Sequence, residues 1–378
     1  MNRRGFVTTG AAGLVGASTS GALLGTLATP GPARALATQP DETIRLSSNE
    51  NPLGLSPKAR EAAEAALDLG NRYPHAHVPP LREALAAYVG VKDENLVLGA
   101  GSTDLLQMTL QAYAGSNVPL VIAQPTFEDV SSYQGPFDYE LTPVPLTDAL
   151  AHDVGRMREI ADRRRRPSIV YFCNPNNPTG TITKASEIDA WIADAPETTL
   201  FIMDEAYVEY VTDPDFESAL KWIDSRPNVV VVRTFSKIFG MAGMRLGYLA
   251  AHPDTAERIA EFVAKSNVSI PTLHAGLASL QDDGLVARSQ EVNEAAKKIV
   301  TDTCRELGLE TLPTNTNFLM HRINGDLRTY IGRMRDAGLL VGRPFPPMLG
   351  WNRLSFGLPE EQGRWAETIR SFRQKGWV

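Results

Sequence analysis

Short apolar runs alternate with more polar stretches along the chain between about residues 96 and 251. Several runs are rich in Val and Ile and apolar on both faces, as in the strands of a buried parallel sheet. The stretches between them, such as 103–113 and 184–193, have helical patterns. This alternation predicts an α/β domain with crossover helices. The predicted strands are 96–98, 119–122, 168–173, 199–203, 228–233 and 246–250.

The pattern becomes continuously helical from about residue 253 to 289, broken by Pro271. A smaller region with short strands near 318–320 and 353–356 follows, and residues 44–71 are expected to fold back on it. We therefore predict four parts: a leader at 1–37, an N-terminal segment at 41–72 that packs on the small domain, a large domain at 73–265, and a linking helix with a small α+β domain at 266–378.

The start of the chain has the parts of a signal peptide. The pair Arg3–Arg4 precedes a weakly apolar stretch at 8–29, and small-x-small sites end at Ala35 and Ala37. Paired arginines before a mild apolar core resemble a twin-arginine signal. The stretch is rich in Gly and less apolar than a stable membrane span. We expect cleavage near these alanines and a periplasmic or secreted product, with a cytoplasmic location as the alternative.

Composition and charge narrow the classes of protein. The chain has 378 residues, of which 43% are hydrophobic and 21% charged, which suits two packed globular domains. The net charge of −7 argues against a nucleic-acid binder, and the basic run 163–166 is interpreted as a solvated helix end. Cys173 lies in an apolar run, where a buried small side chain is expected. The six histidines lack metal-ligand spacing, so we expect no metal site.

Polar residues follow four of the predicted strands, at the edge where open α/β sheets bind ligands. After the predicted strand 228–233, Lys237 follows hydroxyl residues and precedes a glycine-rich stretch. Asp204 directly follows the predicted strand 199–203. The segment 99–104 places glycines and hydroxyls at a helix start, which suits an anion. It also half-matches a dinucleotide fingerprint, so a nucleotide-binding dehydrogenase is an alternative. The fourth segment is the Asn/Pro turn at 174–180.

Amino-group chemistry on a cofactor needs a lysine, a carboxylate, phosphate donors and an arginine for the substrate. Lys237, Asp204 and the segment 99–104 offer the first three, and the asparagines of the turn at 174–180 could present an amide to the ring hydroxyl of the cofactor. From the segment 49–54 to the segment 354–357, the chain resembles the class I/II aminotransferases of the aspartate aminotransferase fold, closest to the histidinol-phosphate aminotransferase branch. The resemblance implies fold type I, with a large domain built on a mostly parallel sheet flanked by helices. It also implies pyridoxal 5'-phosphate and transfer of an amino group from an amino acid or related amine to a 2-keto acid.

The resemblance also implies residue roles. Lys237 forms the Schiff base and moves the proton, Asp204 pairs with the pyridine nitrogen, and Tyr207 contacts the ring hydroxyl. Arg353 grips the substrate carboxylate or its equivalent. Tyr73 reaches the neighbouring subunit's cofactor, which implies a homodimer with shared sites. The cofactor-binding set is Gly101, Ser102, Thr103, Phe127, Asn177, Asp204, Tyr207, Thr234, Ser236, Lys237, Arg245 and Tyr73.

The sequence leaves alternatives open for the substrate and for the reaction class. Histidinol-phosphate relatives carry a Val-Arg pair where this chain has Val341, Gly342 and Arg343, so Arg343 is displaced by one glycine and precedes a stiff proline run. Arg343 is thus a candidate substrate residue, and we favour an amino acid or related amine over histidinol phosphate. A decarboxylase or lyase of the same fold, similar to threonine-phosphate decarboxylase, is the alternative reaction.

Overall fold

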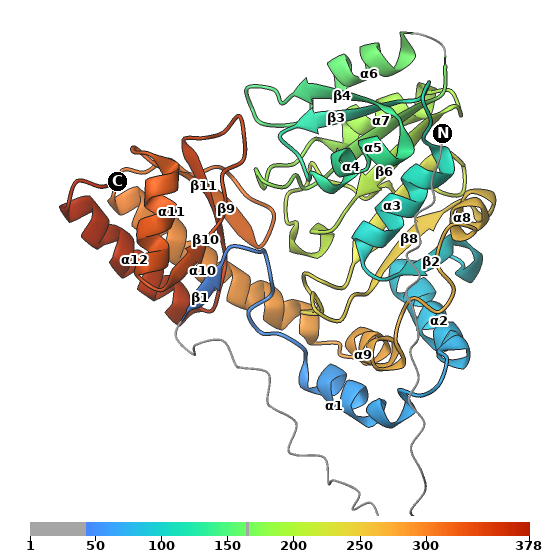
Figure 1. Ribbon diagram of the computed structural model, residues 1–378, viewed down its shortest axis with the longest axis horizontal. Coiled ribbons are helices and arrows are strands. Elements are labelled where there is room, and N and C mark those ends of the chain that lie inside the picture. Colours follow the sequence, from blue (N-terminus) through green and yellow to red (C-terminus); the bar gives the residue numbers. More distant parts are fainter. Residues whose placement is uncertain (1–42, 164–165) are drawn as a thin grey trace, which may run out of the picture. The chain divides into compact units, whose positions relative to one another are not determined.

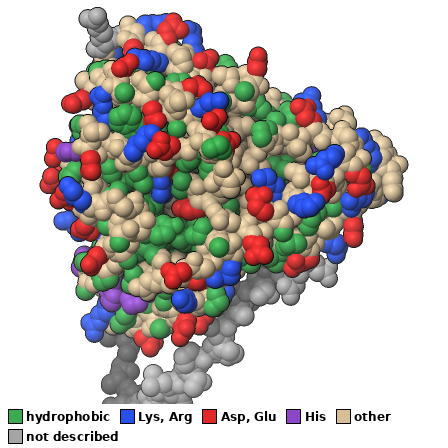
Figure 2. All heavy atoms as spheres, turned by 180° about the vertical axis from the view of Figure 1, so that it is seen from behind, with side chains coloured by type: hydrophobic (Ala, Val, Ile, Leu, Met, Phe, Trp, Pro, Cys, Tyr) green, Lys and Arg blue, Asp and Glu red, His purple; other side chains and the backbone are tan. Residues whose placement is uncertain are grey.

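A computed structural model describes residues 43–163 and 166–378 (Figure 1). The predicted leader at 1–37 lies outside the described residues, as do two arginines of the basic run. None of the described helices combines the length and the apolar character needed to cross a bilayer. On the face seen in Figure 2, acidic and basic side chains are interspersed among the described residues.

A seven-stranded sheet in the order β2-β8-β7-β6-β5-β3-β4 forms the centre of the fold. The run β4-β3-β5-β6-β7 is parallel, whereas β8 pairs antiparallel with both β7 and β2. This mostly parallel sheet confirms the predicted α/β class. The strand bounds are β2 (Leu96–Gly99), β3 (Pro119–Gln124), β4 (Glu140–Pro145), β5 (Ser168–Cys173), β6 (Thr199–Asp204), β7 (Val229–Thr234) and β8 (Gly247–Ala251).

Strand β4 was not among the predicted strands. It lies at the edge of the sheet and carries Pro143 and Pro145, which have no backbone N–H to donate. An edge strand tolerates proline because one side of its backbone needs no partner strand. Its sequence therefore lacks the continuous apolar run that marks the buried strands.

The two faces of the sheet have separate hydrophobic cores. In β5, Val170 and Phe172 belong to one core, whereas Ile169 and Tyr171 belong to the other, because side chains alternate along a strand. Helices α2 (Val78–Val89), α6 (Val154–Asp162) and α7 (Ala185–Asp194) contribute to the first core. Helices α3 (Ser102–Tyr113) and α8 (Pro253–Ala260) contribute to the second. Burial on both faces explains why these strands read as continuous apolar runs.

The helical stretch after the sheet is divided differently from the prediction. The structure has α8, α9 (Ile270–Leu280) and α10 (Leu285–Glu306), with the first break between Ala260 and Ile270. Pro271 does not break a helix: it occupies the first turn of α9, whose N-cap is Ser269. Proline is favoured there because the first-turn N–H groups have no partner within the helix.

The remaining elements build a third hydrophobic core around α10 and α12 (Pro359–Gln374). Strand β1 (Ile44–Leu46) pairs in parallel with β10 (Leu339–Val341), which joins the start of the described chain to its C-terminal region. Strands β9 (Phe318–Arg322) and β11 (Trp351–Ser355) pair antiparallel. The other helices are α1 (Pro57–Ala65), which packs against α9, α4 (Asp129–Ser132), α5 (Gln134–Phe137) and α11 (Leu327–Asp336).

Candidate active site

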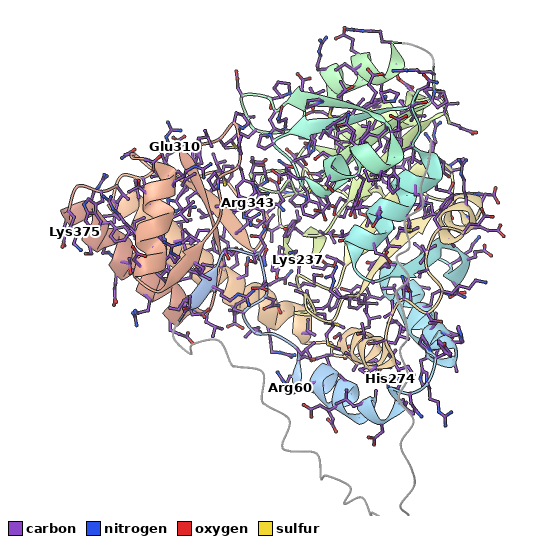
Figure 3. The ribbon with its side chains drawn as sticks, viewed as in Figure 1. Arg60, Lys237, His274, Glu310, Arg343 and Lys375 are labelled. Atoms are coloured by element: carbon purple, nitrogen blue, oxygen red, sulfur yellow. The ribbon has the colours of Figure 1, made fainter. Side chains whose placement is uncertain are left out.

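A cavity of about 300 Å³ lies at the carboxyl ends of β3, β5, β6 and β7. Segments far apart in the sequence line it, and Figure 3 marks two of its residues, Lys237 and Arg343. Most of the residues predicted for the site meet here: Ser102, Thr103, Phe127, Asn177, Asp204, Tyr207, Thr234, Ser236, Lys237, Arg245, Arg343 and Arg353. The volume is at the lower end of small-molecule sites, which fits a cofactor with a small substrate.

Lys237 follows β7 in a short turn and points its amine at the start of the described chain. Its Nζ donates to the carbonyl oxygen of Asn49 at 3.2 Å and lies 5.6 Å from the centre of the Tyr207 ring. Burial, together with the positive charge of Arg353, lowers the pKa of Lys237 to about 8. About a tenth of the amine is therefore neutral at pH 7, far more than for an ordinary lysine, and the neutral form is the nucleophilic one.

Asp204 ends β6 and is buried, with 2% of its surface exposed. The hydroxyl of Tyr171 donates to Oδ2 at 2.7 Å, and the backbone N–H of Ala206 donates to Oδ1 at 3.2 Å. Burial raises the pKa of this carboxyl to about 6, although both hydrogen bonds lower it. A cation beside Asp204 would restore the charged form, which is the environment that a protonated pyridine nitrogen supplies.

Groups that can donate hydrogen bonds gather at the start of α3. Gly101 has φ +96°, and a Cβ at this position would overlap Nη2 of Arg245. The arginine is held by the carbonyl oxygens of Ala242 at 2.9 Å and Ala100 at 3.1 Å. Thr234 Oγ1 donates to Ser236 Oγ at 2.8 Å beside it. Hydroxyls, a guanidinium and a helix N-terminus together make a donor set for phosphate.

Arg353 lies on β11, lines the cavity and is 8% exposed. Its Nη1 donates to Oδ1 of Asn177 and its Nη2 to the carbonyl oxygen of Ser47, both at 2.7 Å. Its Nε has no partner among the described residues. Burial lowers the pKa of Arg353 to about 10. A buried guanidinium that lines the cavity and is bonded only to neutral oxygens in the described part of the chain suits an anionic group.

Several cavity residues were absent from the predicted site. Asn49 Nδ2 donates to the Tyr207 hydroxyl at 3.0 Å, and Glu128 and Phe345 line the cavity beside Arg343. Asn49 belongs to the segment 49–54 that carries the family resemblance, and Glu128 directly follows Phe127, a predicted cofactor-binding residue.

Two predicted residues have other surroundings. Tyr73 is 79% exposed, stacks on His75 at 5.8 Å and does not line the cavity of its own chain. The hydroxyl of Thr103 lines the cavity but donates to Asp129 at 2.9 Å. Its backbone N–H in the first turn of α3 is therefore the donor that suits an anion.

The fold and this cavity define an enzyme that handles amino groups with pyridoxal 5'-phosphate, because each part of that cofactor meets a fitting group. The phosphate suits the site at Gly101 and Arg245, the pyridine nitrogen suits the buried Asp204, and the aldehyde suits the amine of Lys237.

Comparisons with known proteins agree. Residues 41–366 match the model of the family "Aminotransferase class I and II". The histidinol-phosphate aminotransferase of Halalkalibacterium halodurans is 37% identical over 325 residues, which cover 85% of this chain and 86% of that protein. The chain belongs to the class I and II aminotransferases, a family that depends on pyridoxal 5'-phosphate.

Solved structures give the same family. One from Erwinia carotovora atroseptica, provisionally assigned as a histidinol-phosphate aminotransferase, has a TM-score of 0.87 at 40% identity and covers 89% of this chain and 98% of that one. The histidinol-phosphate aminotransferase from Sinorhizobium meliloti in complex with pyridoxal-5'-phosphate has a TM-score of 0.81 at 27% identity, with 87% and 91% covered. The predicted fold and transaminase activity are thereby confirmed, and the dehydrogenase alternative is wrong. Aminotransferases of this fold use small-molecule substrates and are usually dimers.

The predicted location is corrected by the same comparisons. We expected a periplasmic or secreted product from the first 37 residues. The relatives that cover most of the chain are histidinol-phosphate aminotransferases, which are cytoplasmic biosynthetic enzymes, and this contradicts the expectation. The expectation rested on a local order of charged and apolar residues at 1–37. The match to the family covers residues 41–366 instead.

Proposed function

We propose that this aminotransferase takes its amino group from a small amine that carries one anionic group, and that Arg353 binds this group. The observation that carries the proposal is the buried Arg353 guanidinium, which lines the same cavity as Lys237 and faces no acidic side chain in the hydrogen bonds it makes with the described residues. Asn177 and Ser47 orient the guanidinium through its two terminal nitrogens. An anion that accepts from Arg353 places the adjacent amine within the cavity that Lys237 also lines.

The cofactor would be held by the anion site at Gly101 and Arg245, by Asp204 and by Lys237. When bound, pyridoxal 5'-phosphate supplies an electron sink for the bonds of the substrate Cα. Asp204 would keep a proton on the pyridine nitrogen, because a carboxylate buried at this position is stabilised by a cation. Tyr207 and the Asn177 amide nitrogen would donate to the ring hydroxyl, since the Asn177 carbonyl oxygen is already used by Arg353.

Lys237 would act as the proton carrier of the reaction. Its lowered pKa lets Nζ accept a proton from the substrate Cα and release it again near neutral pH. The Asn49 carbonyl and the Tyr207 ring hold Nζ on one side of the cavity.

The names of the relatives make histidinol phosphate a candidate donor beside ordinary amino acids. A panel of amino donors, tested with 2-oxoglutarate and pyruvate as acceptors and followed by cofactor absorbance, tests the proposal. Arg353→Ala should raise the KM for the best donor by about 100-fold, the loss expected for a charge-assisted pair. Lys237→Ala should abolish turnover, and a fully active variant would refute the assignment. Release of carbon dioxide without any keto-acid requirement would favour the decarboxylase alternative.

We also propose a homodimer in which Tyr73 completes the cofactor site of the second copy. The support is that this large aromatic side chain is 79% exposed, although it lies between the 3-10 turns Leu67–Leu69 and His75–His77, where packing could have covered it. Tyr73→Phe should leave the sedimentation coefficient of the dimer unchanged and weaken cofactor binding about fivefold, the value of one hydrogen bond. A monomer at micromolar concentration, or unchanged affinity, would contradict the proposal.

A further inference from the structure

Two oppositely charged side chains meet at the substrate side of the cavity. Glu128 follows Phe127 after β3, and Arg343 follows β10, so the pair joins positions 215 residues apart. Arg343 Nη2 contacts Oε2 of Glu128, and Nη1 lies 3.4 Å from Oε1. Both side chains line the cavity. The pair is therefore part of the wall that a substrate meets.

The surrounding contacts give this pair a defined place. Arg343 Nη1 also donates to the carbonyl oxygen of Pro344 at 3.1 Å. Its guanidinium lies 4.2 Å from the centre of the Phe345 ring, and the guanidinium of Arg353 lies 4.6 Å from the same ring. Phe345 thus contacts both arginines, and Arg343 is a neighbour of the proposed anion-binding residue. Its positive charge lowers the pKa of Arg353, whereas the charge of Glu128 raises it.

The side chains of Glu128, Arg343 and Arg353 together carry a net charge of +1. Glu128 cancels the charge of Arg343, and Arg353 is the positive charge left for the substrate. A carboxylate carries one negative charge, whereas a phosphate monoester carries close to two at neutral pH. One net positive charge balances the charge of a carboxylate. The same charge leaves part of the charge of a phosphate monoester uncompensated in a partly buried site.

We infer that Glu128 is a specificity-determining residue that selects a donor with a single negative charge, an α-amino acid, over a phosphorylated amine. The inference rests on the proposed role of Arg353 as the anion-binding residue. It holds whether or not Arg343 moves. If Arg343 turned toward a substrate phosphate, the carboxylate of Glu128 would be left unpaired near the same phosphate, and the net charge would be unchanged.

An exposed ion pair could instead be a surface feature without consequence, since such pairs contribute little to stability. The Glu128 and Arg343 side chains are 57% and 54% exposed. The inference concerns the field at the ligand and not the stability of the pair, so the test has to measure ligand preference. The pair of Glu306 and Arg370 is a matched control, because its side chains are 53% and 41% exposed and lie outside the cavity lining.

The experiment compares Glu128→Gln, Arg343→Gln and Glu306→Gln in the cofactor-loaded enzyme. Inorganic phosphate and acetate are titrated into each protein by calorimetry, and kcat/KM is measured for histidinol phosphate and for the best amino acid. Glu128→Gln should raise the preference for phosphate over acetate, and for the phosphorylated donor, by about tenfold, the effect of removing one unit charge several ångström from a partly solvated dianion. Arg343→Gln should lower both preferences, and Glu306→Gln should leave them unchanged.

An unchanged ratio in Glu128→Gln, or an equal loss for both ligands, would overturn the inference. So would a wild-type enzyme that prefers the phosphorylated donor by a large factor. If no donor reacts with the wild-type enzyme, the proposed function fails instead. The anion titrations would still report on Glu128 in that case, so the two failures remain distinguishable.

Discussion

Replacing Asp204 by Asn tests the central electrostatic feature of the site. The carboxyl is 2% exposed, and burial raises its pKa from 3.8 to about 6. This rise corresponds to about 3 kcal/mol by which the buried site disfavours the charged carboxylate. A cationic ring nitrogen beside Asp204 recovers this free energy, whereas an Asn side chain offers no charge to pair with. We therefore expect Asp204→Asn to reduce the rate of the first half-reaction by at least about 100-fold.

The measurement is single-turnover stopped-flow absorbance with a saturating amino donor, together with titration of cofactor into the apoprotein. Tyr171→Phe is the matched control, because it removes one donor to Asp204 and leaves the charge in place. It should cost about 1 kcal/mol, or about fivefold in rate. A rate for Asp204→Asn within about threefold of the wild type would refute the reasoning, as would equal losses in the two variants.

Other predictions concern the lysine, the core and the anion site. Only the neutral amine of Lys237 attacks the cofactor, and its pKa is about 8. The rate of cofactor attachment to the apoprotein should therefore rise with pH and level off above about pH 8. Absorbance measured from about pH 6 to about pH 9.5 follows this rate. Glu205→Ala should lower the free energy of unfolding by about 3 kcal/mol in urea titrations, because it leaves the buried Arg233 without its charged partner. Glu205 is 1% exposed and contacts Arg233 at 2.8 Å. The double variant Glu205→Leu with Arg233→Met should recover most of the lost stability. Gly101→Ala should weaken cofactor binding about tenfold in fluorescence titrations, because its Cβ would displace Arg245 at φ +96°.

The strands that carry the site could be predicted closely from the sequence. Residues 168–173 form β5 as predicted, and β6 extends the predicted strand by one residue, to Asp204. Both are buried on two faces, so their apolar runs are continuous and end abruptly at a polar residue. The segment around Pro143 could not be identified in this way, because an edge strand is half solvated and its sequence is mixed.

The roles proposed for Lys237 and Asp204 come from the family resemblance, whereas the contacts among the residues that line the cavity are visible only in the structure. Asn177 meets Arg353 across 176 positions, and Asn49 meets Tyr207 across 158. In the sequence Glu128 follows the predicted cofactor-binding residue Phe127, and no local pattern indicates that it pairs with Arg343.

The sequence by itself therefore determined which residues stand at the ends of buried strands, because the hydrophobic pattern along a strand records how its two faces are covered. Only the tertiary structure decided which charge faces which across the cavity. That depends on how strand β11 and the segments after β3 and β10 are brought together by packing, and contacts between residues distant in the chain leave no periodic trace in the sequence.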